Sequence, residues 1–172
     1  MKDFTYLNLA LDVRAIFERD HDMLNDLSFP FFFQFPTNCC QSASVFFGIC
    51  VKQLFPDSQV QIIRGTTRGD DEYHHYWVVV DKKTYDLTLD QFEEWVEPKF
   101  SEVSKPIYAE SKHPLAKYFF YKKKVDVTDA FVDFITGYAN LNEVLNAFNF
   151  CYIELQKLGW FANFNDLKRD TY

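Results

Sequence analysis

The sequence predicts a compact domain of the α+β class, in which a cysteine-bearing helix packs against a small antiparallel sheet and helices lie at both ends of the chain. Apolar residues recur at helical spacing near both termini, whereas β-branched and aromatic runs separated by turn signals occupy about residues 60–88. The 172 residues, 48% of them hydrophobic, are enough to bury one core. We therefore predict a single domain, 1–172, with a core at about 28–100 and a helical extension at about 101–172.

The N-terminal part of the chain predicts helix followed by a packed loop. From about residue 5 to 27, one or two helices are expected, because six apolar side chains recur at near-helical spacing: Leu9, Val13, Ile16, Phe17, Leu24 and Leu27. Residues 28–36 contain two prolines among five phenylalanines. Since proline restricts its own backbone and that of the preceding residue, we expect this segment to be extended and anchored.

The middle of the chain predicts a helix and then three strands. The helix is expected from Cys40 to about Leu54, because Asn38 or Thr37 can cap its start and Pro56 follows its end. The strands are expected at about 60–63, 75–80 and 85–88, with a hairpin turn at 81–84.

The C-terminal part of the chain predicts mainly helix. A short helix or turn at 90–95 and a strand at 118–121 precede two helices. Thr128 or Asp126 can cap the first of these helices, and Asn140 the second, which ends at Gly159. We expect both helices to contribute packing and not chemistry.

Charge and hydropathy exclude two classes of partner. The net charge is −7, and the longest basic run is only Lys122–Lys124, so we expect no nucleic-acid partner. No apolar run approaches the roughly 18 to 20 residues that span a bilayer, so we expect no membrane partner. The N-terminus lacks the pattern of a signal peptide. We predict a cytoplasmic protein, although export by a leaderless route would leave no trace in the sequence. The sequence does not indicate the oligomeric state.

Two of the four cysteines stand out by position. Cys50 and Cys151 fall within apolar helical patterns and are expected to be buried thiols. Cys39 and Cys40 are adjacent at the predicted start of a helix. A helix N-terminus carries partial positive charge and unpaired N–H groups, which stabilise a thiolate and any anion that forms beside it. A cysteine at this position can therefore be a nucleophile.

A histidine and a carboxylate follow on the predicted strands, in the order that thiol catalysis needs. Such catalysis combines a thiolate, a base that activates it and a polar group that orients the base. His75 lies near the start of the second strand and Asp86 on the third. Because a hairpin pairs these strands, their side chains can meet across roughly 5 Å. The spacing permits a triad of Cys40, His75 and Asp86.

A zinc site is the competing interpretation of the same region, with Cys39, Cys40, His74 and His75 as ligands. Adjacent strand residues point to opposite faces, so the two histidines cannot easily converge on one ion. The chain also lacks the usual paired spacings of zinc ligands. We therefore predict no metal and no cofactor.

Three motifs carry a resemblance to a known superfamily. They are F-P-x-x-C-C at 35–40, H-x-W at 75–77 and D-[IL]-T-x-D-Q-F at 86–92. In these motifs the chain resembles a group of largely uncharacterised bacterial and phage proteins. That group is similar to papain-like and transglutaminase-like cysteine enzymes, whose core is a helix bearing Cys followed by an antiparallel sheet bearing His and Asp. The resemblance covers residues 35–92, roughly a third of the chain.

The resemblance implies a role for each motif residue. Cys40 would be the nucleophile, His75 the general base and acid, and Asp86 its orienting partner. Papain-like enzymes place a glutamine six residues before the nucleophile as an oxyanion donor, and Gln34 occupies that position relative to Cys40. Cys39 stays the alternative nucleophile.

The expected function is therefore thiol-dependent chemistry on an amide of a protein or peptide substrate. A cysteine peptidase, a glutamine deamidase and a transglutaminase-like acyltransferase all fit the pattern. The alternative is a non-catalytic binding module on a degenerate papain-like scaffold.

Overall fold

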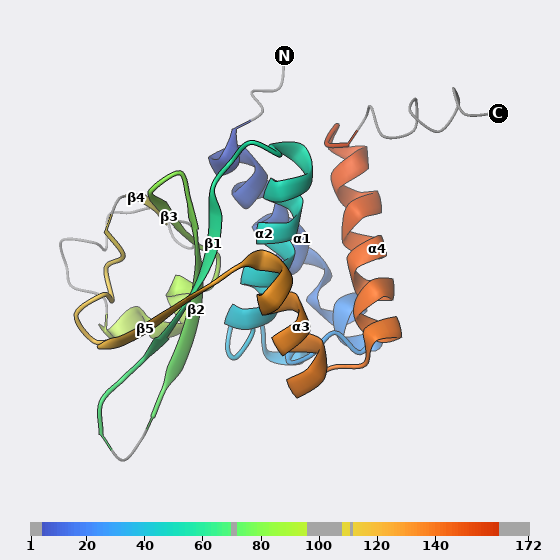
Figure 1. The fold of residues 1–172 in the computed structure, drawn as a ribbon. Helices are drawn as coiled ribbons and strands as arrows, with labels where there is room; N and C mark the ends of the chain where they lie inside the picture. The colour runs from blue at the N-terminus through green and yellow to red at the C-terminus, as the bar shows by residue number, and fades with distance from the viewer. Residues whose placement is uncertain (1–4, 70–71, 96–107, 111, 162–172) are drawn as a thin grey trace.

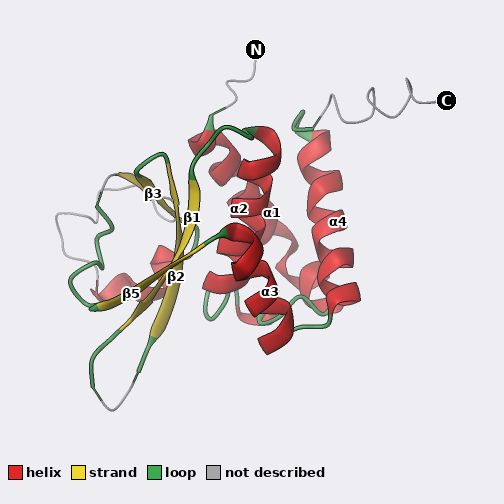
Figure 2. Ribbon diagram, viewed as in Figure 1, coloured by secondary structure: helices red, strands yellow, loops and turns green. Residues whose placement is uncertain are grey.

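The computed structural model describes residues 5–69, 72–95, 108–110 and 112–161. The chain forms two layers, an antiparallel sheet and a group of helices that covers one face of it (Figure 1). In the order in which they pair, the five strands are β4 (Tyr108–Glu110), β3 (Lys83–Asp86), β2 (His74–Val80), β1 (Val60–Thr66) and β5 (Tyr121–Val125). The predicted α+β class is confirmed (Figure 2).

The helices pack around α2 (Cys40–Leu54), which lies between the sheet and the others (Figure 1). These are α1 (Tyr6–Asp26), α3 (Val127–Gly137) and α4 (Leu141–Lys157). The main apolar core draws side chains from all four helices and from strands β1, β2 and β3. A second, smaller cluster contains Ile63, Trp77, Leu89, Leu115 and Phe119. None of the described helices is long and apolar enough to cross a membrane.

Residues 28–36 form turns, so the prediction of an extended segment is wrong. The N–H of Phe32 donates to the carbonyl oxygen of Phe29 at 3.4 Å, and Phe31 between them has φ 69° and ψ 1°. These are the angles of the third residue of a type II turn, which favours proline at the second position, here Pro30. The short 3-10 helix η1 (Phe32–Gln34) follows. The proline therefore starts a turn where we expected it to hold the chain extended.

The start of α2 also differs from prediction. Its N-cap residue is Cys39, whose side chain makes no capping hydrogen bond, so the expected cap by Asn38 or Thr37 is wrong. Asn38 has φ 62°, which is left-handed and unlike the extended conformation of a capping residue. The side chain of the N-cap residue Cys39 therefore does not cap the first turn of α2.

The predicted hairpin is confirmed between β2 and β3. Asp81 and Lys82 at its turn have φ 47° and 71°, as the two central residues of a type I′ turn require. The register pairs Tyr85 with Val78. Asp86 follows directly, and the chain then enters the 3-10 helix η2 (Leu89–Trp95), where a short helix or turn was expected.

The last strand lies further along the chain than predicted. Residues 114–118 form turns, and β5 begins only at Tyr121, where it pairs with β1 at the edge of the sheet. We expected a strand at 118–121. An edge strand with both faces exposed needs no apolar pattern, and the lysines at 122–124 fill it. Asp126 and Asn140 cap α3 and α4 as predicted.

Gly65 provides a test of packing between β1 and the smaller cluster. A Cβ atom there would lie 2.7 Å from the Cβ of Phe119 and 2.8 Å from the Trp77 ring. We expect Gly65→Ala to lower the free energy of unfolding by about 2 kcal/mol, measured by urea denaturation, because overpacking forces its neighbours to shift. The matched control is Gly137→Ala, since no atom lies within 4 Å of a Cβ there. Equal stabilities for the two variants would contradict this packing.

Candidate functional site

The site forms where the start of α2 meets β2 and the end of β3. Cys40 is the first residue of α2, His75 the second residue of β2 and Asp86 the last residue of β3. Along β2, His74 is exposed and His75 is fully buried, as strand alternation requires. The His75 ring lies among the rings of Phe92, Phe119 and His113, at centroid distances of 4.7 to 5.8 Å.

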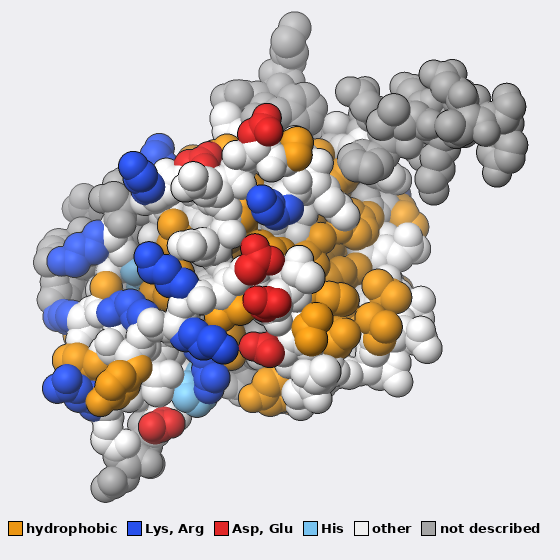
Figure 3. Space-filling view, viewed as in Figure 1, with side chains coloured by type: hydrophobic (Ala, Val, Ile, Leu, Met, Phe, Trp, Pro, Cys, Tyr) orange, Lys and Arg blue, Asp and Glu red, His pale blue; other side chains and the backbone are white. Residues whose placement is uncertain are grey.

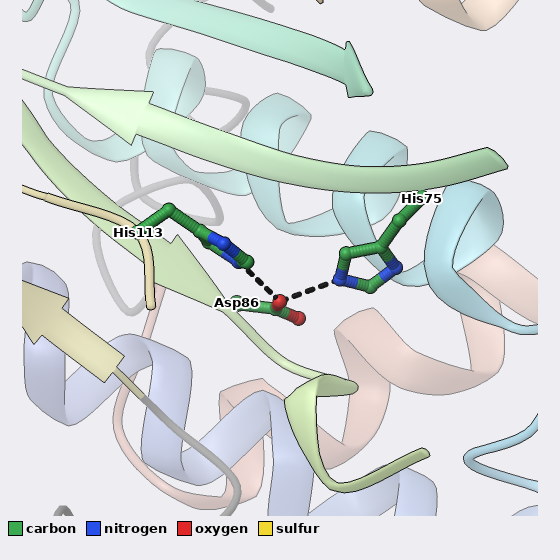
Figure 4. Close-up of side chains that lie close together, drawn as sticks. All are labelled: His75, Asp86 and His113. Carbon is green, nitrogen blue, oxygen red and sulfur yellow. Dashed lines mark hydrogen bonds and ion pairs between the residues drawn. The ribbon is translucent and has the colours of Figure 1, made fainter. Parts of the chain in front are cut away.

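Asp86 is fully buried, and four donors surround its carboxylate. One oxygen, Oδ2, lies 2.6 Å from Nε2 of His75 and 2.8 Å from Nε2 of His113 (Figure 4). The other, Oδ1, accepts from the backbone N–H of Thr88 at 2.9 Å and from its hydroxyl at 3.4 Å. These donors stabilise the charged form of the carboxylate and fix its orientation.

The hydrogen bonds define which ring nitrogens carry protons. The N–H of Leu115 donates to Nδ1 of His113 at 3.1 Å, so the proton of the neutral His113 ring is on Nε2 and points to Asp86. His75 likewise donates from Nε2 to Asp86. This leaves Nδ1 of His75 on the side away from the carboxylate (Figure 4).

Electrostatics favour an ion pair between His75 and Asp86. Burial disfavours a charged His75, but the charge and hydrogen bond of Asp86, with a smaller contribution from Cys40, raise its pKa to about 10. Burial also opposes charge on Asp86, yet His75 and the hydrogen bond from His113 hold its pKa well below the usual range. Burial lowers the pKa of His113. At neutral pH the cluster therefore contains an imidazolium, a carboxylate and a neutral imidazole.

The two adjacent cysteines have different surroundings. Cys40 lines a pocket of about 550 Å³ and is among the groups that raise the pKa of His75. Cys39 is fully buried, with Sγ 3.4 Å from the carbonyl oxygens of Phe31 and Thr37. Burial, and to a smaller extent Cys40, raise the pKa of Cys39 to about 12. Of the two cysteines, Cys40 is the one that lines the pocket.

Gln91, and not Gln34, is among the described residues that line the pocket beside Cys40. Gln34 lies in η1 and is not among the described residues that line the pocket. Gln91 lines it, and its Nε2 donates to the Thr88 carbonyl at 3.0 Å and lies 3.5 Å from Nδ1 of His75. Its Oε1 is 3.4 Å from the backbone nitrogen of Asn38. Gln91 belongs to the quoted D-[IL]-T-x-D-Q-F motif, so the sequence did contain a signal for it.

Two further residues of the site were missed by sequence reasoning. His113 follows a segment of mixed polarity, and no pattern in the sequence marks it. Arg14 on α1 is buried, donates to the Leu87 carbonyl at 2.6 Å and pairs with both carboxylate oxygens of Asp90 at 2.8 and 3.1 Å. Arg14 therefore fastens the segment between Asp86 and Gln91 to the helical layer.

The metal interpretation can be compared with these positions. His74 bonds the Thr66 hydroxyl at 3.0 Å and is exposed, so it does not converge with buried His75 on one ion. Within the described part of the chain, the ligand atoms of His75, Asp86 and His113 lie within 4.8 Å of one another. Both ring nitrogens, however, point at the same carboxylate oxygen, so the cluster is joined by its own hydrogen bonds (Figure 4).

Comparison with protein-family models, with curated proteins and with solved structures finds no match for this chain.

Proposed function

We propose that the protein is a thiol-dependent enzyme that attacks an amide of a protein or peptide, with Cys40 as nucleophile. The observation that carries the proposal is the buried His75–Asp86 pair, which lies where Cys40 faces a pocket from the start of a helix and raises the pKa of His75. The sequence order of cysteine helix, histidine strand and aspartate strand supports the papain-like or transglutaminase-like core that the motifs imply. We infer a Cys40-His75-Asp86 triad.

In the first step, the Cys40 thiolate attacks the amide carbon and a carbon–sulfur bond forms. The imidazolium of His75 gives its Nδ1 proton to the departing amine as the carbon–nitrogen bond breaks, which leaves a thioester and a neutral ring. Asp86 holds His75 through Nε2 and stabilises its positive charge.

In the second step, water or an amine attacks the thioester while Nδ1 of His75 takes the proton of the incoming group. The carbon–sulfur bond then breaks, and the thiolate and imidazolium are restored. Water gives a peptidase or a glutamine deamidase, and an amine gives transglutaminase-type acyl transfer.

The oxyanion needs donors in both steps. We assign this role to the backbone N–H groups at the first turn of α2, where the side chain of Cys39 forms no cap, together with the side-chain amide of Gln91. Gln91 takes the place that the resemblance implies for Gln34, because Gln91 lines the pocket.

Thiol labelling tests the proposal without a known substrate. At about pH 6 we expect iodoacetamide to modify Cys40 faster than a free thiol, because the proposed mechanism pairs Cys40 with the imidazolium of His75. Mass spectrometry of the digested protein locates the label. Cys39 is the internal control, since its burial and raised pKa predict no labelling of the folded protein.

Two results would contradict the proposal. Cys40 labelling no faster than glutathione would remove its main support and favour a non-catalytic binding module. If iodoacetamide labelled Cys39 faster than Cys40, the nucleophile would be Cys39 and not Cys40.

A further inference from the structure

The pocket beside Cys40 is lined by two groups of aromatic rings. Phe31 and Tyr138 lie 6.5 Å apart at their ring centroids, and Phe134 on α3 lines the pocket with them. Tyr73 and Phe92 contact Trp95 at 5.5 and 5.1 Å. The rings come from the turn before α2, from α3, from the residue before β2 and from η2.

Three of these rings are exposed to solvent. Tyr138, Tyr73 and Phe31 are 61%, 52% and 40% exposed. Phe31 also has a left-handed backbone, which costs about 1 to 3 kcal/mol for a residue of this kind. The thiol of Cys39 lies 3.4 Å from the Phe31 carbonyl oxygen and braces that turn. A strained, braced turn that presents an aromatic ring to a pocket is typical of a binding site and not of core packing.

No charged side chain is among the described residues that line this pocket. Burial, together with the nearby charge of Arg64, lowers the pKa of His74 at its edge, so His74 is neutral at pH 7. On the face shown in Figure 3, basic side chains gather over the sheet and acidic ones over α3. Apart from the Cys40 and His75 pair of the proposed mechanism, a charged substrate group that entered the pocket would lose hydration and find no opposite charge among the described residues that line it.

We propose that the pocket selects an uncharged peptide segment with large aromatic or aliphatic side chains next to the amide presented to Cys40. This inference rests on the proposed function, because it takes Cys40 as the reacting group. The volume of about 550 Å³ is within the range of small-ligand sites and fits a short segment. Stacking and apolar burial on the two groups of rings provide the affinity.

Binding to the full-length Cys40→Ala variant tests the inference without turnover. The probes are three acetylated tripeptide amides with alanine in the middle and phenylalanine, lysine or glutamate at both flanking positions. We expect the phenylalanine peptide to bind about tenfold tighter than either charged peptide, measured by calorimetry. Phe31→Ala and Trp95→Ala, each in the Cys40→Ala background, should each weaken its binding several-fold.

The matched control is Phe33→Ala, because Phe33 is 63% exposed in the same turn region and does not line the pocket. Equal affinities for the three peptides, or equal losses in the Phe31 and Phe33 variants, would overturn the inference. Selective binding without turnover by the wild-type protein would leave the inference standing and refute the proposed function. Turnover by the wild-type protein without selective binding would support the proposed function and overturn the inference.

Discussion

Replacing Cys40 by serine is expected to lower kcat by about 10⁴-fold or more, without loss of the fold. A serine hydroxyl has to lose its proton before it attacks. His75, whose pKa is raised to about 10, is already protonated at neutral pH and cannot take that proton. The activity is first found by profiling a proteome treated with the wild-type protein, read for both cleavage and the mass shift of deamidation. kcat is then measured on the substrate that this identifies.

Cys39→Ser is the matched control. Its hydroxyl can still donate to the carbonyl oxygens of Phe31 and Thr37, so we expect activity within about tenfold of wild type. If Cys39→Ser abolished activity and Cys40→Ser preserved it, Cys39 and not Cys40 would be the nucleophile. If Cys40→Ser lost stability and kept activity, Cys40 would be a packing residue.

The order of α1, α2 and strands β1 to β3 could be predicted because each depends on local patterns. The hairpin between β2 and β3 has β-branched strands and a turn sequence, and the helix α2 has apolar residues on nearly every face. The same patterns place His75 and Asp86 on neighbouring strands. Their side chains can therefore meet, as predicted, and they do so at 2.6 Å. Local rules therefore lead directly to the centre of the site.

The residues that complete the site depend on tertiary packing that local rules do not describe. His113 reaches Asp86 from a turn that has no helical or strand pattern. Arg14 is a charged residue on a buried helix face, and its partners Leu87 and Asp90 lie more than 70 positions away in the chain. Gln34 has the spacing of an oxyanion residue, but the left-handed turns at Phe31 and Asn38 fold its segment differently from an extended one.

Asp86→Asn is expected to lower the free energy of unfolding by about 3 kcal/mol or more near pH 6. The change leaves a fully buried His75 without its counter-ion, and breaking one side of a buried pair usually costs this amount. Thermal or urea unfolding measures the loss. Asp126→Asn is the matched control, because Asp126 caps α3 at the surface and asparagine caps a helix equally well.

The pH dependence of this loss distinguishes an ion pair from a plain hydrogen bond. The folded pKa of His75 is about 10 and its unfolded value about 6.5, so its contribution is complete below pH 6.5 and disappears as the pH rises through 10. The folded pKa of Asp86 is lowered, so its contribution is present above about pH 3.9 and disappears as the pH falls further.

The difference in stability between wild type and Asp86→Asn should therefore be largest near pH 5 to 6 and shrink toward both pH 10 and pH 3. Without its partner, His75 resists protonation in the folded variant, so acidification from pH 7 to 5 destabilises the variant further. A difference that stays constant from pH 5 to 10 would mean that His75 is neutral in the folded protein. In that case the thiol of Cys40 would have no imidazolium beside it, and the proposed chemistry would lose its activated nucleophile.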